Sequence, residues 1–132
     1  MGTFNNIEEA KKHFEGDKYA VMTGVELEEL TDEYSLASLT LSDIHMNANG
    51  VIMGGAIFTL ADFAFGTLSN NIHKPTVSQQ VSINFLGAPK GKKLFAKAVC
   101  KKNGSRTIVI NIDITDNTGR AVAQFIGTGF KL

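Results

Sequence analysis

The sequence predicts an α+β domain in which one long antiparallel β-sheet wraps around a single central apolar helix. One segment, 54–70, is apolar around nearly its whole helical circumference. Four segments with alternating apolar and polar residues follow it, separated by short turns, as in antiparallel strands. The 132 residues can bury one core but are too few for a separate cofactor domain, so we expect a single domain, 1–132.

The N-terminal third predicts a helix and a hairpin. A short amphipathic helix is expected at Ile7–Phe14, where Asn5 or Asn6 can cap the first turn. Two strands are then expected, Ala20–Leu30 and Tyr34–Leu41, because a turn-like Thr-Asp-Glu sequence separates them. Together they would form an antiparallel hairpin.

The central segment predicts a loop followed by the apolar helix. The loop is expected at Ser42–Met53 and the helix at Gly54–Asn70. Apolar residues recur so densely along this helix that hardly any polar face remains. The helix must therefore be buried on nearly all sides.

The last part of the chain predicts four strands, at Thr76–Phe85, Leu94–Lys102, Ser105–Asp116 and Ala121–Phe130. The Asn-Gly dipeptide at 103–104 fits a type I′ hairpin turn. A sheet curled round one helix leaves its edge strands and part of the helix uncovered, so we expect the chain to self-associate.

Composition excludes several classes of partner and cofactor. Thirteen basic residues balance thirteen acidic ones, and no apolar run is long enough to cross a membrane. The start of the chain has no signal-type segment. We therefore expect a cytoplasmic protein with neither nucleic acid nor membrane as partner. His13, His45 and His73 lack the spacing of a metal site, so no metal is expected.

The overall balance hides an uneven distribution of charge. Residues 63–112 contain no acidic side chain but eight basic ones. Lysines protect exposed strand edges from pairing, which is one interpretation of this region. The other interpretation is an electropositive rim that binds a phosphorylated small molecule.

Asp62 is the only ionisable side chain between His45 and His73, in a stretch of 27 residues. A carboxylate in apolar surroundings loses hydration, so it must find partners or have a raised pKa. Such a group can activate water as a general base. A buried structural carboxylate is the alternative interpretation.

Gly54 and Gly55 begin the same helix. Glycines there let a ligand approach bare backbone N–H groups at the positive end of the helix dipole. A carbonyl polarised there, with help from the amide of Asn47, gains about 3 kcal/mol of transition-state stabilisation per good donor. Alternatively, the glycines only permit close packing and Asn47 only shapes a turn.

Helix geometry separates these two sets of groups. Gly54 and Asp62 are about 12 Å apart along a helix that rises about 1.5 Å per residue. One chain therefore cannot bring its Asp62 to a carbonyl held at its own Gly54. If both act on one atom, two antiparallel helices must meet across a two-fold axis, which predicts a homodimer with two composite sites.

The segment from His45 to Asp62 resembles a known signature. It reads HMNANGVIMGGAIFTLAD, and it is similar to the pattern H-x-N-x-x-G-x-x-H-G-G-x-x-F-x-L-A-D of the PaaI-like hotdog-fold acyl-CoA thioesterases. The expected order of helices and strands agrees with this family over nearly the whole chain. The resemblance implies a hotdog fold and hydrolysis of an acyl-CoA thioester to a free acid and coenzyme A. It implies no cofactor, since coenzyme A is part of the substrate.

The resemblance also implies roles for individual residues. Asp62 would be the general base or nucleophile, while Asn47 and the Gly54 amide would hold the thioester carbonyl. Ser78, on the following strand, would orient the attacking water, as a hydroxyl does in some members. Met53 departs from the family, which usually has histidine there, and so removes an imidazole from the wall of the site.

Further residues are expected to contact the substrate. Basic residues at strand ends would meet the coenzyme A phosphates, as they do in similar proteins. Other contacts would come from the loop and the first turns of the helix. The expected contacts are Gly55, His45, Met53, Phe58, Lys90, Lys92, Lys93 and Arg106.

Two other functions are compatible with the same fold. A hydratase or dehydratase would need a histidine opposite the helix carboxylate, and His45 would have to supply it in place of Met53. A non-catalytic acyl-CoA-binding protein could keep the glycines, but it would have no need of Asp62. The sequence leaves open whether the acyl group is aryl, short or medium-chain, and whether dimers pair into a tetramer through their sheets.

Overall fold

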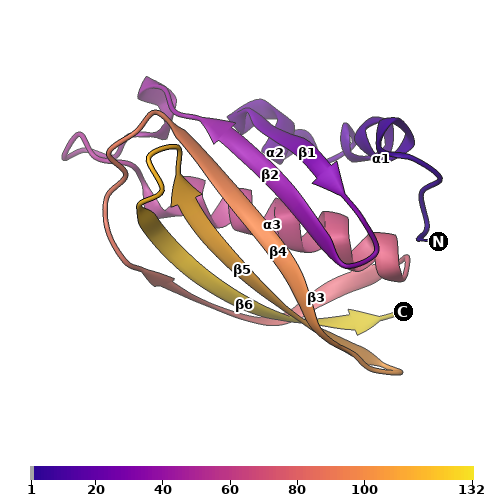
Figure 1. Ribbon diagram of the computed structural model, residues 1–132. Coiled ribbons are helices and arrows are strands. Elements are labelled where there is room, and N and C mark those ends of the chain that lie inside the picture. Colours follow the sequence, from indigo (N-terminus) through magenta and orange to yellow (C-terminus); the bar gives the residue numbers. More distant parts are fainter. Residues whose placement is uncertain (1) are drawn as a thin grey trace.

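A six-stranded antiparallel sheet curls around one long helix, α3, in the computed structural model, which describes residues 2–132 (Figure 1). The helix α3 is Gly54–Ile72, and the strands lie in the order β1-β2-β4-β5-β6-β3. The strands are β1 Val25–Leu30, β2 Tyr34–Thr40, β3 Thr76–Phe85, β4 Lys93–Asn103, β5 Thr107–Asp116 and β6 Ala121–Lys131. The predicted fold class is therefore confirmed.

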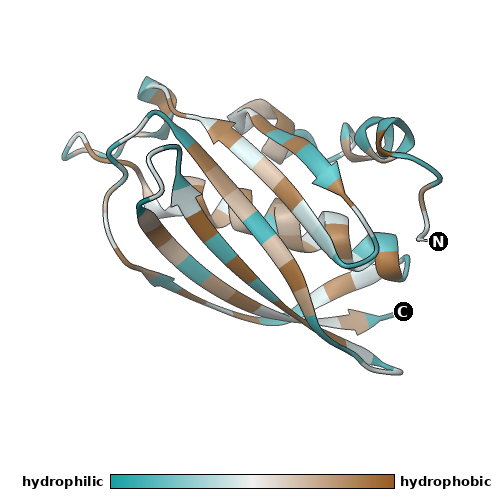
Figure 2. Cartoon of the chain, viewed as in Figure 1, coloured by the Kyte–Doolittle hydropathy of each residue, from teal (hydrophilic) through white to brown (hydrophobic). Residues whose placement is uncertain are grey.

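The inner face of the sheet packs against α3 to form the core. Apolar and polar residues alternate along the long strands, as Figure 2 shows. Close contact with the helix requires a glycine on β6, since a Cβ on Gly127 would lie 2.8 Å from the Phe65 ring. The alternate isoleucines of β5 are fully buried, as their spacing predicted: Ile108, Ile110, Ile112 and Ile114.

The helix α3 runs antiparallel to β3. At one end, the Asn70 side chain accepts a hydrogen bond from the Thr76 N–H at 3.0 Å and donates one to the Thr76 carbonyl at 3.3 Å. At the other end, the Phe85 ring lies 3.0 Å from the position of a Cβ on Gly54. The start of α3 therefore lies at the end of the sheet where β3 ends and β4 begins (Figure 1).

The N-terminal segment differs from its prediction in one element. Helix α1, Ile7–Phe14, forms as expected, and the Asn6 side chain caps it by accepting from the Glu9 N–H at 2.9 Å. The predicted strand Ala20–Leu30 is wrong in its first half, because Lys18–Thr23 forms a second helix, α2. Gly24 ends this helix at a φ of 98°, the left-handed conformation typical of a helix end, and the strand begins only after it.

The predicted type I′ turn at 103–104 is also wrong. Such a turn needs positive φ at both central residues, but no non-glycine residue in 2–132 has positive φ, and Gly104 has none either. The connection is longer instead, with the Gly104 N–H bonded to the Thr107 carbonyl at 2.9 Å. The Lys131 ammonium donates to the Gly104 carbonyl at 2.6 Å and so helps to hold this open loop.

One side of the fold lacks a cover in the single chain. The strand β3 is at the edge of the sheet, and Val77 and Phe85 on it are 45% and 54% exposed. The residues of α3 beside this edge are likewise partly open to solvent. No helix in the described range 2–132 has the length and hydropathy needed to cross a lipid bilayer.

Candidate active site

Asp62 lies in the middle of α3, on a stripe that the sheet leaves uncovered. Gly55, Thr59, Asp62 and Gly66 follow one another at intervals of three or four residues, which places them along one side of the helix. Gly55 and Asp62 are exposed, and the other two are half-buried. No group in 2–132 donates a hydrogen bond to the Asp62 carboxylate. The structural interpretation of Asp62 therefore lacks the partners that it would need.

A hollow of about 490 Å³ opens beside Asp62, between the start of α2 and α3. The loss of water there raises the pKa of Asp62, and the negative charge of Asp17 raises it further. Burial also raises the pKa of Asp17, against the opposing effect of His13. A carboxylate with a raised pKa is better able to accept a proton near neutral pH. The hollow is lined by Asp17, Lys18, Tyr19, Ala20, Phe58, Thr59, Asp62 and Phe63.

Two of these lining residues bear on the sequence predictions. Phe58 was expected at the substrate, and its ring both lines the hollow and packs 5.5 Å from Phe125 in the core. Asp17 was missed, because α2 was predicted as a strand. The glycine at position 24 was the signal that could have revealed α2, since a glycine within a strand pattern often marks an interruption.

The first turn of α3 presents free backbone donors. Neither the Gly54 nor the Gly55 N–H donates to any atom in the described range 2–132, whereas the Ala56 N–H bonds to the Met53 carbonyl at 3.0 Å. Met53 precedes the helix without capping it through its side chain. Free N–H groups at a helix start favour an anion or an oxyanion.

Asn47 is fixed by its own loop. Its backbone N–H donates to the Val51 carbonyl at 2.7 Å, and its side-chain oxygen accepts from the Asn49 and Val51 N–H groups at 2.9 and 3.3 Å. The turn-shaping role is therefore present. It occupies the backbone N–H and the side-chain oxygen, and leaves the Nδ2 amino group as the donor available to a ligand.

His45 braces the loop and has no free ring nitrogen. Its side chain is 4% exposed. Its Nδ1 accepts a hydrogen bond from the Ser42 N–H at 3.0 Å, and its Nε2 donates one to the Thr23 carbonyl at 2.6 Å. His45 also borders an apolar pocket of about 400 Å³ together with Met53 and Gly55. Met53 is 53% exposed there, so a thioether stands where the family pattern has histidine.

Ser78 lies just before a β-bulge in the edge strand β3 and is exposed. Ser78 pairs with Gly129 and Gln80 with Thr128, so one residue of β3 is extra. A Cβ on Gly129 would lie 3.1 Å from the Phe65 ring, which shows that this position faces α3. Ser78, directly opposite, shares that face. It lies about 20 Å along β3 from the Phe85 ring that touches Gly54, so one chain does not bring Ser78 and Gly54 together.

The predicted basic contacts fall into two places. Lys90, Lys92 and Lys93 lie in and beside the loop before β4, at the same end of the molecule as the start of α3. Arg106 follows the other end of β4, about 33 Å away along the strand, and is exposed. A single chain therefore cannot place all four on one phosphate group.

The lysine loop is held by a carboxylate that the sequence analysis did not single out. Asp116 is 2% exposed and accepts hydrogen bonds from the Lys90 and Gly91 N–H groups at 2.7 and 2.9 Å. Further bonds from Thr118 and Arg120 hold the pKa of Asp116 well below its usual range. The loop backbone is thereby fixed. Lys90 and Lys92 are exposed, whereas the Lys93 ammonium lies 5.4 Å from the centre of the Phe95 ring.

No three His, Cys, Asp or Glu residues in 2–132 come together as a possible set of metal ligands.

Comparison with known proteins gives four findings. The profile of the thioesterase superfamily matches residues 49–123. The acyl-coenzyme A thioesterase PaaI of Escherichia coli is 27% identical over 120 residues, which cover 90% of this chain and 86% of PaaI. The structure of the E. coli PaaI protein, from the phenylacetic acid degradation operon, aligns with a TM-score of 0.89 at 25% identity. The alignment covers 96% of this chain and 92% of that one. A hypothetical thioesterase protein of Streptococcus pneumoniae, crystallised with coenzyme A, aligns with a TM-score of 0.81 at 28% identity, covering 89% of this chain and 94% of that one.

Proposed function

The chain belongs to the thioesterase superfamily, and from this premise we propose that it hydrolyses acyl-CoA at a site combining Asp62 with the first turn of α3. Its hotdog fold and its PaaI-like relatives make it a thioester hydrolase. The observation that carries the assignment of the site is the hollow in which Asp62, with a raised pKa, has no hydrogen-bond donor of its own.

In this mechanism, Asp62 removes a proton from water while the water oxygen attacks the thioester carbonyl carbon. The carbonyl oxygen becomes an oxyanion, which accepts from the Gly54 N–H and from Nδ2 of Asn47. The carbon–sulfur bond then breaks, the leaving coenzyme A thiolate takes the proton from Asp62, and the acyl group leaves as a carboxylic acid. Ser78 would orient the water. Direct attack by Asp62 would instead form an anhydride and put oxygen-18 from labelled water into Asp62 during turnover.

A second copy of the chain completes the site in this proposal. Asp62 and Gly54 are about 12 Å apart along α3, so they cannot reach the same carbonyl carbon from one chain. The exposed edge of β3 and the open stripe of α3 lie on the side where an antiparallel α3 could pack. A homodimer of this kind would carry two identical composite sites.

The coenzyme A moiety is expected at the end of the molecule where α3 begins. Lys90 and Lys92 lie in the loop at that end and Lys93 begins β4 there, and basic side chains suit the phosphate groups of coenzyme A. Arg106 lies at the opposite end of its own chain, so in an antiparallel dimer only the Arg106 of the second copy could approach the same coenzyme A.

A hydratase or dehydratase is less well supported. That reaction would need a histidine opposite Asp62, and Met53 cannot provide one. His45 was the substitute considered from the sequence, but both of its ring nitrogens are bonded to the backbone and it is 4% exposed.

The test is the release of free thiol from phenylacetyl-, benzoyl-, acetyl- and hexanoyl-CoA by the wild-type protein and by Asp62→Asn. We expect at least one ester to be hydrolysed and the variant to be at least about 100-fold slower, the lower limit for a positioned general base. Asp113→Asn is the matched control, because this exposed carboxylate lies on the outer face of β5. Equal activity of Asp62→Asn and wild type would exclude the proposed role of Asp62. Binding of acyl-CoA without turnover would favour a binding protein.

A further inference from the structure

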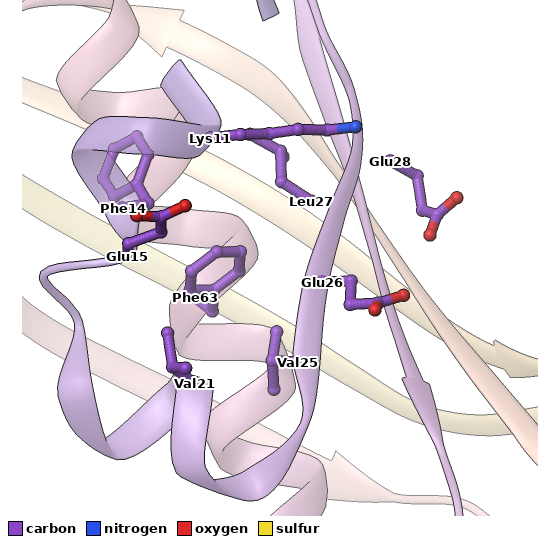
Figure 3. Close-up of a pocket in the computed structure, with 9 residues that line it drawn as sticks. All are labelled: Lys11, Phe14, Glu15, Val21, Val25, Glu26, Leu27, Glu28 and Phe63. Atoms are coloured by element: carbon purple, nitrogen blue, oxygen red, sulfur yellow. The ribbon is translucent and has the colours of Figure 1, made fainter. Parts of the chain in front are cut away.

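A second pocket lies between α1, α2 and β1 (Figure 3), and it shares the Phe63 side chain with the Asp62 hollow. Its volume is about 400 Å³, within the range of small-molecule sites. Its floor contains no hydrogen-bonding side chain. The floor consists of Phe14, Val21, Val25, Leu27 and Phe63.

Phe63 is a wall common to both cavities. It lines the hollow at Asp62 and the pocket between α1, α2 and β1, and it is 6% exposed. On the far side its ring meets Phe14 edge-on, with 5.9 Å between ring centroids. A molecule bound at Asp62 is therefore separated from the second pocket by the thickness of one aromatic side chain.

The rim of this pocket carries a net negative charge. Three glutamates, Glu15, Glu26 and Glu28, border it with a single lysine, Lys11, and the side chains of Glu26 and Glu28 project from the side of β1 opposite the floor (Figure 3). Such a rim repels phosphate and carboxylate groups. The apolar floor in turn favours hydrocarbon, because each buried CH₂ group increases affinity about fourfold.

We propose that this pocket binds the end of an unbranched hydrocarbon acyl chain, which enters past Phe63 from a thioester positioned at Asp62. The inference rests on the proposed function and names its substrate class: medium-chain acyl-CoA with an uncharged terminus. Acetyl and other short groups end before Phe63 and do not use the pocket.

The test compares kcat/KM for acetyl-, butanoyl-, hexanoyl-, octanoyl- and decanoyl-CoA. For wild type we expect a rise of about two- to fourfold per methylene from hexanoyl to octanoyl. Val21→Trp places an indole in the pocket itself, and Val21 is 49% exposed, so the core need not rearrange. This variant should lose at least about tenfold with octanoyl-CoA and change less than about twofold with acetyl-CoA.

Val99→Trp is the matched control, because Val99 is 42% exposed and faces away from α3 on β4. It should keep the wild-type dependence on chain length. Octanedioyl-CoA provides a second control, since it has the length of octanoyl-CoA but ends in a carboxylate. The glutamate rim predicts that it reacts at least about tenfold more slowly than octanoyl-CoA.

The outcomes separate this inference from the proposed function. Hydrolysis without any gain from added methylenes, or an equal loss for acetyl and octanoyl esters in Val21→Trp, overturns the pocket and leaves the thioesterase intact. If no ester is hydrolysed, the proposed function fails, and titration calorimetry of octanoyl-CoA and acetyl-CoA then decides the pocket. A preference for octanoyl-CoA that Val21→Trp abolishes supports it, and equal affinities for the two esters refute it.

Discussion

A dimer assembled from two differently inactivated chains tests whether the active site is composite. One chain carries Asp62→Asn, which removes the general base. The other carries Asn47→Asp, which keeps a side-chain oxygen for the Asn49 and Val51 N–H groups and so preserves the loop, but removes the Nδ2 donor. Both substitutions replace one side chain by another of nearly the same shape, so folding should be unaffected.

The expected activity follows from the separation of Asp62 and Gly54 along α3, about 12 Å. If each site takes Asp62 from one chain and Asn47 from the other, the mixed dimer contains one intact site and one site with both defects. It should therefore have about half of the wild-type activity per dimer. Each homodimer should have about 1% or less, because general bases and oxyanion donors each contribute at least about 100-fold.

The two chains are co-expressed with different affinity tags, purified over both columns, and assayed for thiol release from the best acyl-CoA. A reciprocal dimer is the control, in which one chain is wild type and the other carries both substitutions. It has no intact site if the sites are composite, and one intact site if each chain holds its own. Size-exclusion chromatography confirms that every sample is dimeric.

The result that refutes the reasoning is the inverse pattern. An inactive mixed dimer together with a half-active reciprocal dimer would mean that Asp62 and Asn47 of the same chain act on the same carbonyl. The separation of Gly54 and Asp62 along α3 would then not require a second copy of the chain. A monomer with full activity would also exclude the composite site, because such a site needs residues from two chains.

Two further predictions concern a charge and a glycine. Asp17→Asn removes a like charge that raises the pKa of Asp62, so the acidic limb of the kcat/KM profile should move to lower pH. The control Asp113→Asn should leave the limb in place. A limb that stays or moves to higher pH in Asp17→Asn contradicts the charge interaction between the two carboxylates. Gly127→Ala puts a Cβ 2.8 Å from the Phe65 ring. We expect it to lower the free energy of unfolding by about 1–3 kcal/mol, measured by urea denaturation. Unchanged stability would mean that the ring moves aside freely.

The sequence predicted those parts of the molecule that depend on local periodicity. The alternation of Ile108, Ile110, Ile112 and Ile114 placed the inner face of β5, since a strand has a period of two. The density of apolar residues likewise predicted α3, which begins at Gly54 as expected and ends two residues later than predicted. The candidate base and the free helix N–H groups were also local features, because a single carboxylate in an apolar stretch and a pair of glycines are visible without a fold.

Tertiary structure decided which residues meet and which polar groups remain free. The hollow beside Asp62 exists only because α2 packs near α3 and brings Asp17 to it, and no pattern in the sequence links those two positions. The carbonyl of Thr23, which lies 22 positions before His45, occupies the ring nitrogen that a catalytic histidine would need. The length of β4 puts Arg106 at the far end from the three lysines with which the sequence had grouped it. Such outcomes depend on contacts between distant segments, and the periodicity of one segment carries no information about the donors and acceptors that another segment will supply.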